Sequence, residues 1–98
     1  MSESTVSELE RLGFDAAQEV AGTDAVKQVE VASGVDLFER PAYFFSFLID
    51  QGLAQHRAGL VRIRLMQKLL DELTARDDDH LPIIQILNQE DWEKRSVA

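Results

Sequence analysis

Apolar residues recur at intervals of three and four along residues 6–20, which is the spacing of an amphipathic helix. The pattern predicts a helix over residues 5–21, and the S/T-x-x-E sequences that begin at Thr5 and Ser7 each offer a capping box for its first turn. Gly13 is a weak point inside this segment, where a first short helix could end instead. The chain is therefore expected to begin with helical structure.

The next segment, residues 25–33, fits two kinds of structure. Residues 29–31 alternate apolar and polar side chains as a strand does, and valine favours a pleated sheet. Val26 and Val29 are also at helical spacing, so a helix stays open as an alternative. A turn-rich stretch at 33–36 follows, and a glycine-containing loop between two strand-like runs favours an antiparallel hairpin.

The run at 41–49 is the most apolar part of the chain and contains three of its five Phe residues together with its only Tyr. In a strand its side chains would alternate between two mainly apolar faces, with Tyr43, Phe45, Phe47 and Ile49 on one and Phe44, Ser46 and Leu48 on the other. A strand that is apolar on both faces is typical of the centre of a sheet. The alternative is a helix, because short apolar runs are ambiguous by period alone.

A long helix is predicted from Ala54 or Ala58 to Ala75, because this segment is rich in Leu, Arg, Gln and Lys. Its apolar side chains form a broad stripe, made of Ile63, Met66, Leu69, Leu70 and Leu73. The opposite face is basic and contains Arg57, Arg64 and Lys68. We expect the stripe to cover the core, and the basic face to meet solvent, the acidic first half of the chain or a partner.

Pro82 enforces extended backbone before a short β-branched run, so residues 83–87 are expected to form a third strand. A last helical turn is expected at 90–95. The resulting order is helix, strand, strand, long helix, strand. This order predicts an α+β fold, in which a small three-stranded, mainly antiparallel sheet is packed by the N-terminal helix and the long helix.

The length of the chain corresponds to one domain over residues 1–98. An all-α bundle is the alternative to the α+β fold, with helices at 25–33 and 41–51 in place of strands. In both cases residues 1–5 and 96–98 are expected to be flexible tails.

Charge and composition narrow the classes of function. The net charge of −8 is concentrated in residues 1–50, which carry ten acidic and three basic residues. An acidic surface repels phosphate and anionic lipid, so nucleic acid is a disfavoured partner and no membrane contact is expected. The sequence has no cysteine and no signal-peptide pattern at its N-terminus, which fits a cytoplasmic protein without disulfides or thiolate metal sites.

No pattern in the sequence indicates catalysis. Glycine-rich nucleotide motifs, hydrolase nucleophile motifs and zinc-hydrolase histidine motifs are absent from the sequence, so we expect no enzyme and no cofactor. Residues 77–80 read Asp-Asp-Asp-His and carry possible cation ligands, but adjacent residues on a short loop rarely converge on one ion. We interpret them as a solvent-exposed loop that ends the long helix, and we assign no metal site.

Arg62 and Trp92 are further candidates for partner contacts. Arg62 projects beside the apolar stripe, between Leu69 and Met66 in azimuth, where it must extend to solvent, pair with a carboxylate or face a partner. Trp92 is the only Trp and lies in a charged segment. It is expected to anchor the C-terminus to the core, with a role at an interface as the alternative.

These observations predict a small acidic, non-catalytic protein-interaction domain. It would act as a homodimer or as the accessory or regulatory partner of another protein, and an antitoxin-like partner is one concrete form. The possible contact residues are Arg57, Arg62, Arg64, Lys68 and Trp92. The alternative function is a nucleic-acid-contacting regulator that uses the basic face of the helix at 57–68.

Overall fold

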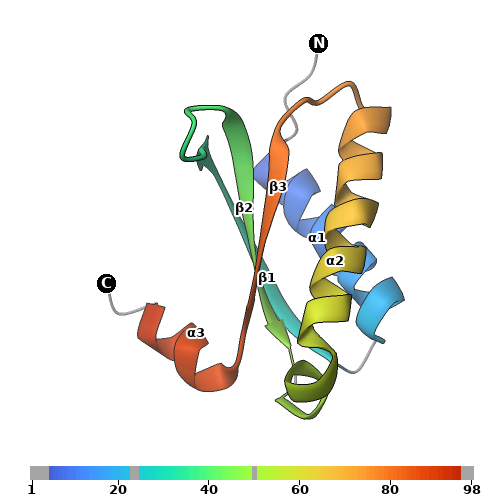
Figure 1. Ribbon diagram of the computed structural model, residues 1–98, viewed down its shortest axis with the longest axis vertical. Helices are drawn as coiled ribbons and strands as arrows, with labels where there is room; N and C mark the ends of the chain where they lie inside the picture. Colours follow the sequence, from blue (N-terminus) through green and yellow to red (C-terminus); the bar gives the residue numbers. More distant parts are fainter. Residues whose placement is uncertain (1–4, 23–24, 50, 96–98) are drawn as a thin grey trace.

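The chain folds as a three-stranded sheet with two helices on one side and a short helix on the other (Figure 1). The computed structural model describes residues 5–22, 25–49 and 51–95, the side chains of 51–58 and 95 apart. In chain order the elements are α1 (Val6–Ala21), β1 (Val26–Val35), β2 (Pro41–Ile49), α2 (Gln51–Ala75), β3 (Leu81–Leu87) and α3 (Gln89–Arg95). The predicted α+β fold is confirmed, and the all-α alternative is wrong.

Several elements are longer than predicted. β1 has ten residues, and α2 begins at Gln51, ahead of the predicted start. The expected helical turn near the C-terminus is the seven-residue helix α3. Of the expected tails, Thr5 belongs to the cap of α1, whereas 1–4 and 96–98 lie outside the described residues.

α1 begins at the first of the two predicted capping boxes. The Thr5 hydroxyl accepts a hydrogen bond from the Glu8 backbone N–H at 3.2 Å, and the Glu8 carboxylate accepts one from the Thr5 N–H at 3.1 Å. The helix is continuous across Gly13, which lies against the sheet. A Cβ at this position would come within 3.1 Å of both Phe45 and Val29, so glycine permits the close approach of helix and sheet.

β2 is the central strand, and its two neighbours run in opposite directions relative to each other. β1 pairs with it antiparallel through the hairpin, with Val31 opposite Phe45. β3 pairs with it parallel, with Ile84 beside Phe45. A parallel neighbour requires a crossover connection, which α2 provides. The predicted hairpin and the central position of β2 are therefore confirmed, and the parallel β2–β3 pair completes the sheet.

The sheet face beneath α1 and α2 forms the main core. The four β2 side chains predicted for one face are each at most 2 % exposed, namely Tyr43, Phe45, Phe47 and Ile49. They pack with buried side chains of both helices and of β3, which include Leu9, Ala16, Ala17, Val61, Leu65, Leu69, Leu73 and Ile84.

α3 covers one end of the opposite sheet face. Trp92 packs there with Leu48 and Leu87 in a second apolar cluster. Toward the hairpin, Phe44 and Ile83 are only half-buried. The central strand is therefore covered on both faces only at the end that carries α3.

α2 has two apolar strips that face in different directions. The inner strip repeats every four residues and is at most 5 % exposed, comprising Val61, Leu65, Leu69 and Leu73. The outer strip is 42 to 55 % exposed, comprising Leu60, Ile63, Met66 and Leu70. The prediction that Ile63, Met66 and Leu70 cover the core is wrong, because the sheet and α1 pack against only one side of the helix. Even with both strips, no helix among the described residues is long and apolar enough to cross a membrane.

Candidate functional site

The connection between α2 and β3 is tied to the sheet by a buried aspartate. α2 ends in a Schellman motif, in which Asp77 takes a left-handed conformation with φ 60°. The Asp78 N–H donates to the Leu73 carbonyl at 2.9 Å, and the Asp77 N–H donates to that of Thr74 at 3.0 Å. This turn leaves Asp78 only 6 % exposed, beside Tyr43 of the central strand.

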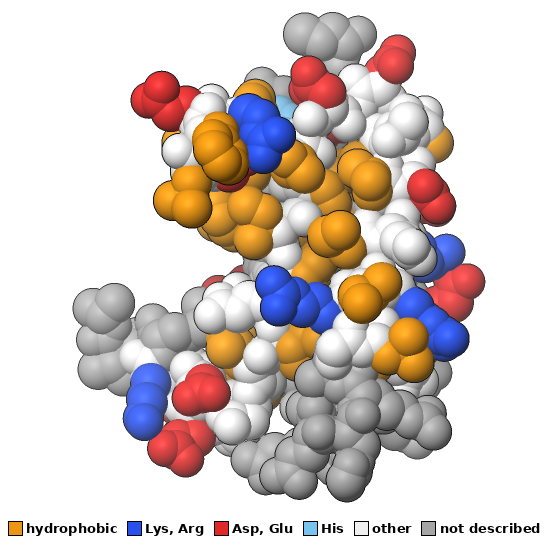
Figure 2. Space-filling view, viewed as in Figure 1, with side chains coloured by type: hydrophobic (Ala, Val, Ile, Leu, Met, Phe, Trp, Pro, Cys, Tyr) orange, Lys and Arg blue, Asp and Glu red, His pale blue; other side chains and the backbone are white. Residues whose placement is uncertain are grey.

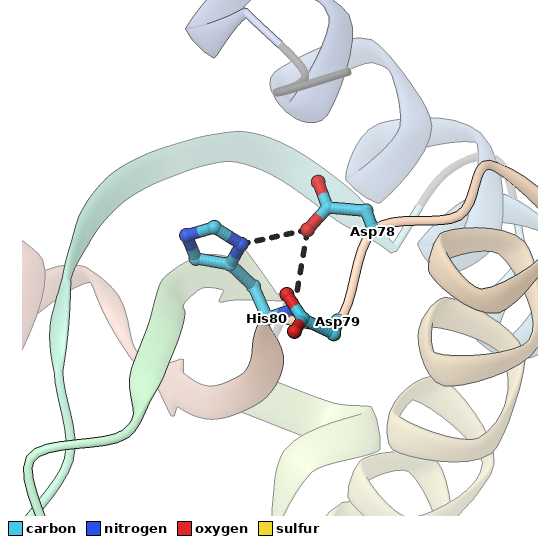
Figure 3. A group of neighbouring side chains, drawn as sticks. All are labelled: Asp78, Asp79 and His80. Atoms are coloured by element: carbon cyan, nitrogen blue, oxygen red, sulfur yellow. Dashed lines mark hydrogen bonds and ion pairs between the residues drawn. The ribbon is translucent and has the colours of Figure 1, made fainter. Parts of the chain in front are cut away.

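Both carboxylate oxygens of Asp78 accept hydrogen bonds. The Tyr43 hydroxyl donates to Oδ2 at 2.6 Å, and the His80 backbone N–H donates to Oδ1 at 3.1 Å. The His80 Nδ1 also lies 2.6 Å from Oδ1 (Figure 3). The His80 ring stacks on the Tyr43 ring, with centroids 4.1 Å apart and planes inclined by 3°. The three side chains thus form one contact network between β2 and the residue before β3.

Hydrogen bonding outweighs burial in setting the charge of Asp78. Desolvation raises the pKa of its carboxyl group, but the Tyr43 hydroxyl and the backbone and ring of His80 lower it further, so the pKa lies below the usual value. Asp78 is therefore ionised at neutral pH. The prediction that residues 77–80 form a solvent-exposed loop is wrong for Asp78, whose side chain is buried.

The same loop places three potential cation ligands together. Ligand atoms of Asp78, Asp79 and His80 lie within 4.8 Å of one another. Both Asp78 oxygens already accept hydrogen bonds from Tyr43 and His80, and these contacts hold the connection to the sheet. We assign the cluster a structural role, in which it fastens the α2–β3 connection to the central strand.

Asp36 organises the hairpin connection between β1 and β2. Its Oδ1 accepts hydrogen bonds from the backbone N–H groups of Phe38 at 2.8 Å and Arg40 at 2.9 Å. Its Oδ2 accepts one from Arg40 Nε at 2.8 Å. These contacts, above all the one from the Arg40 backbone, hold the pKa of Asp36 below its usual value. Backbone hydrogen bonds from Asp36 to Arg40 and from Glu39 to Asp36 close the loop, with Glu39 at φ 61°.

This closed loop presents large apolar side chains to solvent. Leu37 is 97 % exposed and Phe38 76 %, and the Arg40 guanidinium lies 5.2 Å from the centroid of the Phe38 ring. Beside them is a cavity of about 440 Å³, lined by Val35, Asp36, Leu37, Phe38, Phe44 and Ile83. Figure 2 shows apolar side chains gathered at the hairpin end and over the adjoining elements. We call the six residues that line this cavity the hairpin surface.

The predicted basic face of α2 lies among acidic residues of the same chain. Lys68 Nζ is 2.9 Å from Glu19 Oε2 of α1, and this hydrogen bond raises the pKa of Lys68. Arg64 is exposed and borders the same shallow surface as Asp71 and Glu72. The side chain of Arg57, the third predicted contact on this face, lies outside the described residues.

Arg62 and Trp92 occupy separate parts of the molecule. Arg62 is exposed and lines a groove between α2 and β3, which agrees with its expected position beside the apolar stripe. Trp92 is 6 % exposed and packs against Leu48 and Leu87, so it anchors α3 to the sheet as expected. Of the predicted contact residues whose side chains are described, Arg64 and Lys68 border one surface, whereas Arg62 and Trp92 lie in two other places.

Leu37 and Phe38 are candidate contact residues that the sequence analysis missed. They lie in a turn-rich connection, where side chains are commonly exposed and carry no pattern of their own. One signal could have identified them: two large apolar residues placed between Asp36 and Arg40, which can close a loop around them.

Comparisons with protein families, curated proteins and solved structures found no match to this chain. What the protein does must therefore be inferred from its own surfaces. Among the described residues, the hairpin surface combines the highest exposure of large apolar side chains with an adjacent apolar cavity.

Proposed function

We propose that the protein is a non-catalytic protein-interaction domain that assembles through its hairpin surface. The observation that carries the proposal is the exposure of Leu37 and Phe38 on a loop closed by Asp36. Exposed apolar residues are ordinary when scattered singly, whereas a group of them marks an interaction site. A loop already held in its bound conformation loses little conformational entropy on association, which increases affinity.

A second copy of the chain is the partner that fits this surface best. The protruding side chains of Leu37 and Phe38 and the cavity bordered by Phe44 and Ile83 belong to the same surface. A two-fold axis can therefore place Leu37 of each copy in the cavity of the other, as in an isologous dimer. Burial of one leucine or phenylalanine side chain contributes about 1.5–3 kcal/mol, and each copy would bury two.

The charges of the hairpin connection permit two copies to approach. Arg40 and Asp36 form an ion pair at 2.8 Å, which neutralises both groups. The net charge of −8 on each copy still produces long-range repulsion. We therefore expect added salt to strengthen the dimer, because screening weakens this repulsion while apolar burial persists.

The accessory or regulatory role beside another protein, including an antitoxin-like role, is the other form of this function. Such a partner would need an apolar cavity of its own to receive Leu37 and Phe38, whereas a second copy already has one. The nucleic-acid alternative has less support, because Lys68 is paired with Glu19 and Arg64 lies beside acidic residues. The cytoplasmic location stays a prediction.

Light scattering coupled to size-exclusion chromatography over a concentration series tests the homodimer. The mass of the wild-type protein should rise from that of one chain toward that of two as the concentration increases. The double variant Leu37→Ser/Phe38→Ser should stay monomeric while its circular dichroism spectrum is unchanged. Val6→Ser is the matched control, because it removes an apolar side chain that is 50 % exposed on α1, and it should dimerise like the wild type.

Two results would contradict the proposal. A wild-type protein that stays monomeric at every concentration would exclude the homodimer. If Val6→Ser abolished association as completely as the double variant, association would reflect general apolar exposure and not the hairpin surface.

A further inference from the structure

A second surface lies on the opposite border of the sheet from β1, between α2 and β3. It is a groove of about 320 Å³, lined by Gly59, Arg62, Ile84, Gln85 and Ile86. Met66 and Leu70 follow Arg62 at intervals of four residues and so continue its row along α2. They are 46 % and 42 % exposed. The groove is thus lined by Gly59 and Arg62 of α2 on one side and by β3 on the other, and the apolar row continues along α2 beyond it.

The outer edge of β3 is open within the part of the chain that the structure describes. The strand order β1-β2-β3 leaves β3 with β2 as its one neighbour. Among the described residues, the backbone pairing of 81–87 is with β2. An edge strand presents unpaired N–H and C=O groups that can pair with another extended chain. After Pro82, which has no N–H to donate, residues 83–87 read Ile-Ile-Gln-Ile-Leu and carry none of the charged side chains that commonly protect such an edge.

Arg62 indicates the charge of the chain that would occupy the groove. Arg62 is the one charged side chain among the described residues that line the groove. Arg62 forms no ion pair with any residue that the structure describes. An occupant that covers the Arg62 guanidinium removes its hydration unless the side chain turns outward, and a carboxylate opposite it compensates the charge. The lining therefore favours an occupant with an acidic side chain opposite Arg62.

We propose that the β3 edge and Arg62 form a binding site for an extended acidic segment of a partner protein. The segment adds a strand beside β3 through backbone hydrogen bonds, as in β-augmentation. Its alternate side chains are apolar and contact the row of Met66 and Leu70, and a Glu or Asp side chain pairs with Arg62. The two sites both involve β3, because Ile83 lines the hairpin cavity, but the groove residues Arg62, Ile84, Gln85 and Ile86 are not part of the hairpin surface.

A displayed library of random linear peptides is the probe that tests this site. The full-length Leu37→Ser/Phe38→Ser variant serves as the target, because it lacks the proposed dimer contacts. Selected peptides should alternate apolar and polar positions around a Glu or Asp. Arg62→Glu should weaken their binding by about tenfold or more, since loss of one charge pair and a new repulsion exceed about 1.4 kcal/mol.

Arg64→Glu is the matched control for the charge change. Arg64 lies on the same helix and is also exposed. It does not line the groove but borders a different surface, together with Asp71 and Glu72. It should leave peptide affinity within about twofold of the starting value, apart from long-range electrostatics. Equal losses in the two variants would overturn the assignment of the acidic contact to Arg62.

N-methylation of the selected peptide tests strand addition itself. An added strand directs the N–H groups of every second residue toward β3, and the remaining N–H groups toward solvent. Methylation of one alternate set should therefore abolish binding, and methylation of the other set should preserve it. Equal effects of the two sets, a helical periodicity in the selected sequences or failure to enrich any peptide would each overturn the proposal.

Discussion

The two faces of the central strand differ in how completely they are buried, although both are mainly apolar in sequence. On one face, α1 and α2 bury Tyr43, Phe45 and Phe47 to 1 % exposure or less. On the other face, α3 covers the end that contains Leu48, and no helix among the described residues covers the hairpin end, where Phe44 is half-buried. The first face holds the fold together. The second is left partly uncovered by its own chain, and this is where the hairpin surface lies.

Two aspartates show the same contrast on a smaller scale. Asp78 and Asp36 each accept hydrogen bonds from the loop that contains them, and each has a lowered pKa. Asp78 is buried and bonds to Tyr43 of the core, so its carboxylate links two elements of the fold. The hydrogen bonds described above for Asp36 all lie within the hairpin connection, so this carboxylate positions Leu37 and Phe38. Asp78 therefore stabilises the fold, and Asp36 holds Leu37 and Phe38 in an exposed position.

The largest expected change in the free energy of unfolding distinguishes the two faces of β2. Phe45→Ala should lower the free energy of unfolding by about 3–5 kcal/mol, because it leaves a cavity beneath α1 and α2. Phe44→Ala, the neighbouring residue on the other face, should cost about 1–2 kcal/mol, because its ring is only half-buried. Urea unfolding followed by circular dichroism measures both. Similar losses in the two variants would mean that the faces are covered equally.

The next effect concerns the buried aspartate. Asp78→Asn should lower the free energy of unfolding by about 2–3 kcal/mol at neutral pH, because charge-assisted hydrogen bonds from Tyr43 and His80 are lost. Tyr43→Phe keeps the ring and removes one of these bonds, so it should cost about 1 kcal/mol. Chemical unfolding curves at neutral pH give both values.

The pH dependence of this effect has a defined sign. The pKa of Asp78 is lower in the folded chain than in the unfolded chain, where it is about 3.9. Its stabilising contribution is therefore present above that value and is lost as the pH falls through the folded-state pKa. The gap in stability between wild type and Asp78→Asn should narrow over this acidic range. A gap that stays constant down to the lowest pH would show that ionisation of Asp78 does not stabilise the fold.

The smallest expected change in the free energy of unfolding concerns Asp36, which holds the conformation of the hairpin connection. Asp36→Ala should lower the free energy of unfolding by about 1 kcal/mol, because its hydrogen bonds lie within one surface loop, although the carboxylate itself is only 10 % exposed. It should nevertheless weaken dimerisation by about tenfold, because Leu37 and Phe38 are no longer held in one conformation. Glu39→Gln is the control in the same loop and should retain wild-type association. Sedimentation equilibrium measures these affinities, and an unweakened Asp36→Ala dimer would exclude preorganisation by Asp36.

Much of the fold could be predicted because periodicity identifies the face of each element. The alternation at 43–49 identified the buried side of β2, and Pro82 with the β-branched run after it identified β3. Periodicity does not say what covers a face, so the exposure of Ile63 and Met66 on α2 was missed. That outcome depends on how widely the sheet and α1 extend around the helix.

The candidate sites were harder to predict because they depend on contacts between distant residues. Asp78 is separated by 35 positions from Tyr43, and nothing local to residues 77–80 indicates that its carboxylate turns inward. Leu37 and Phe38 belong to a short connection without periodicity, so their exposure becomes visible only once Asp36 is seen to close the loop. The position of Arg62 beside the apolar stripe could be predicted because it follows from helical spacing alone.

Isotope-filtered nuclear Overhauser spectroscopy on a mixture of labelled and unlabelled protein tests the homodimer most directly. Such an experiment detects contacts between two copies and suppresses those within one copy. The proposed dimer predicts intermolecular signals from Leu37 and Phe38 to Phe44 and Ile83, and their disappearance in Leu37→Ser/Phe38→Ser. A dimer whose intermolecular signals involve other residues, or the absence of any such signal at concentrations where light scattering shows a dimer, would contradict it.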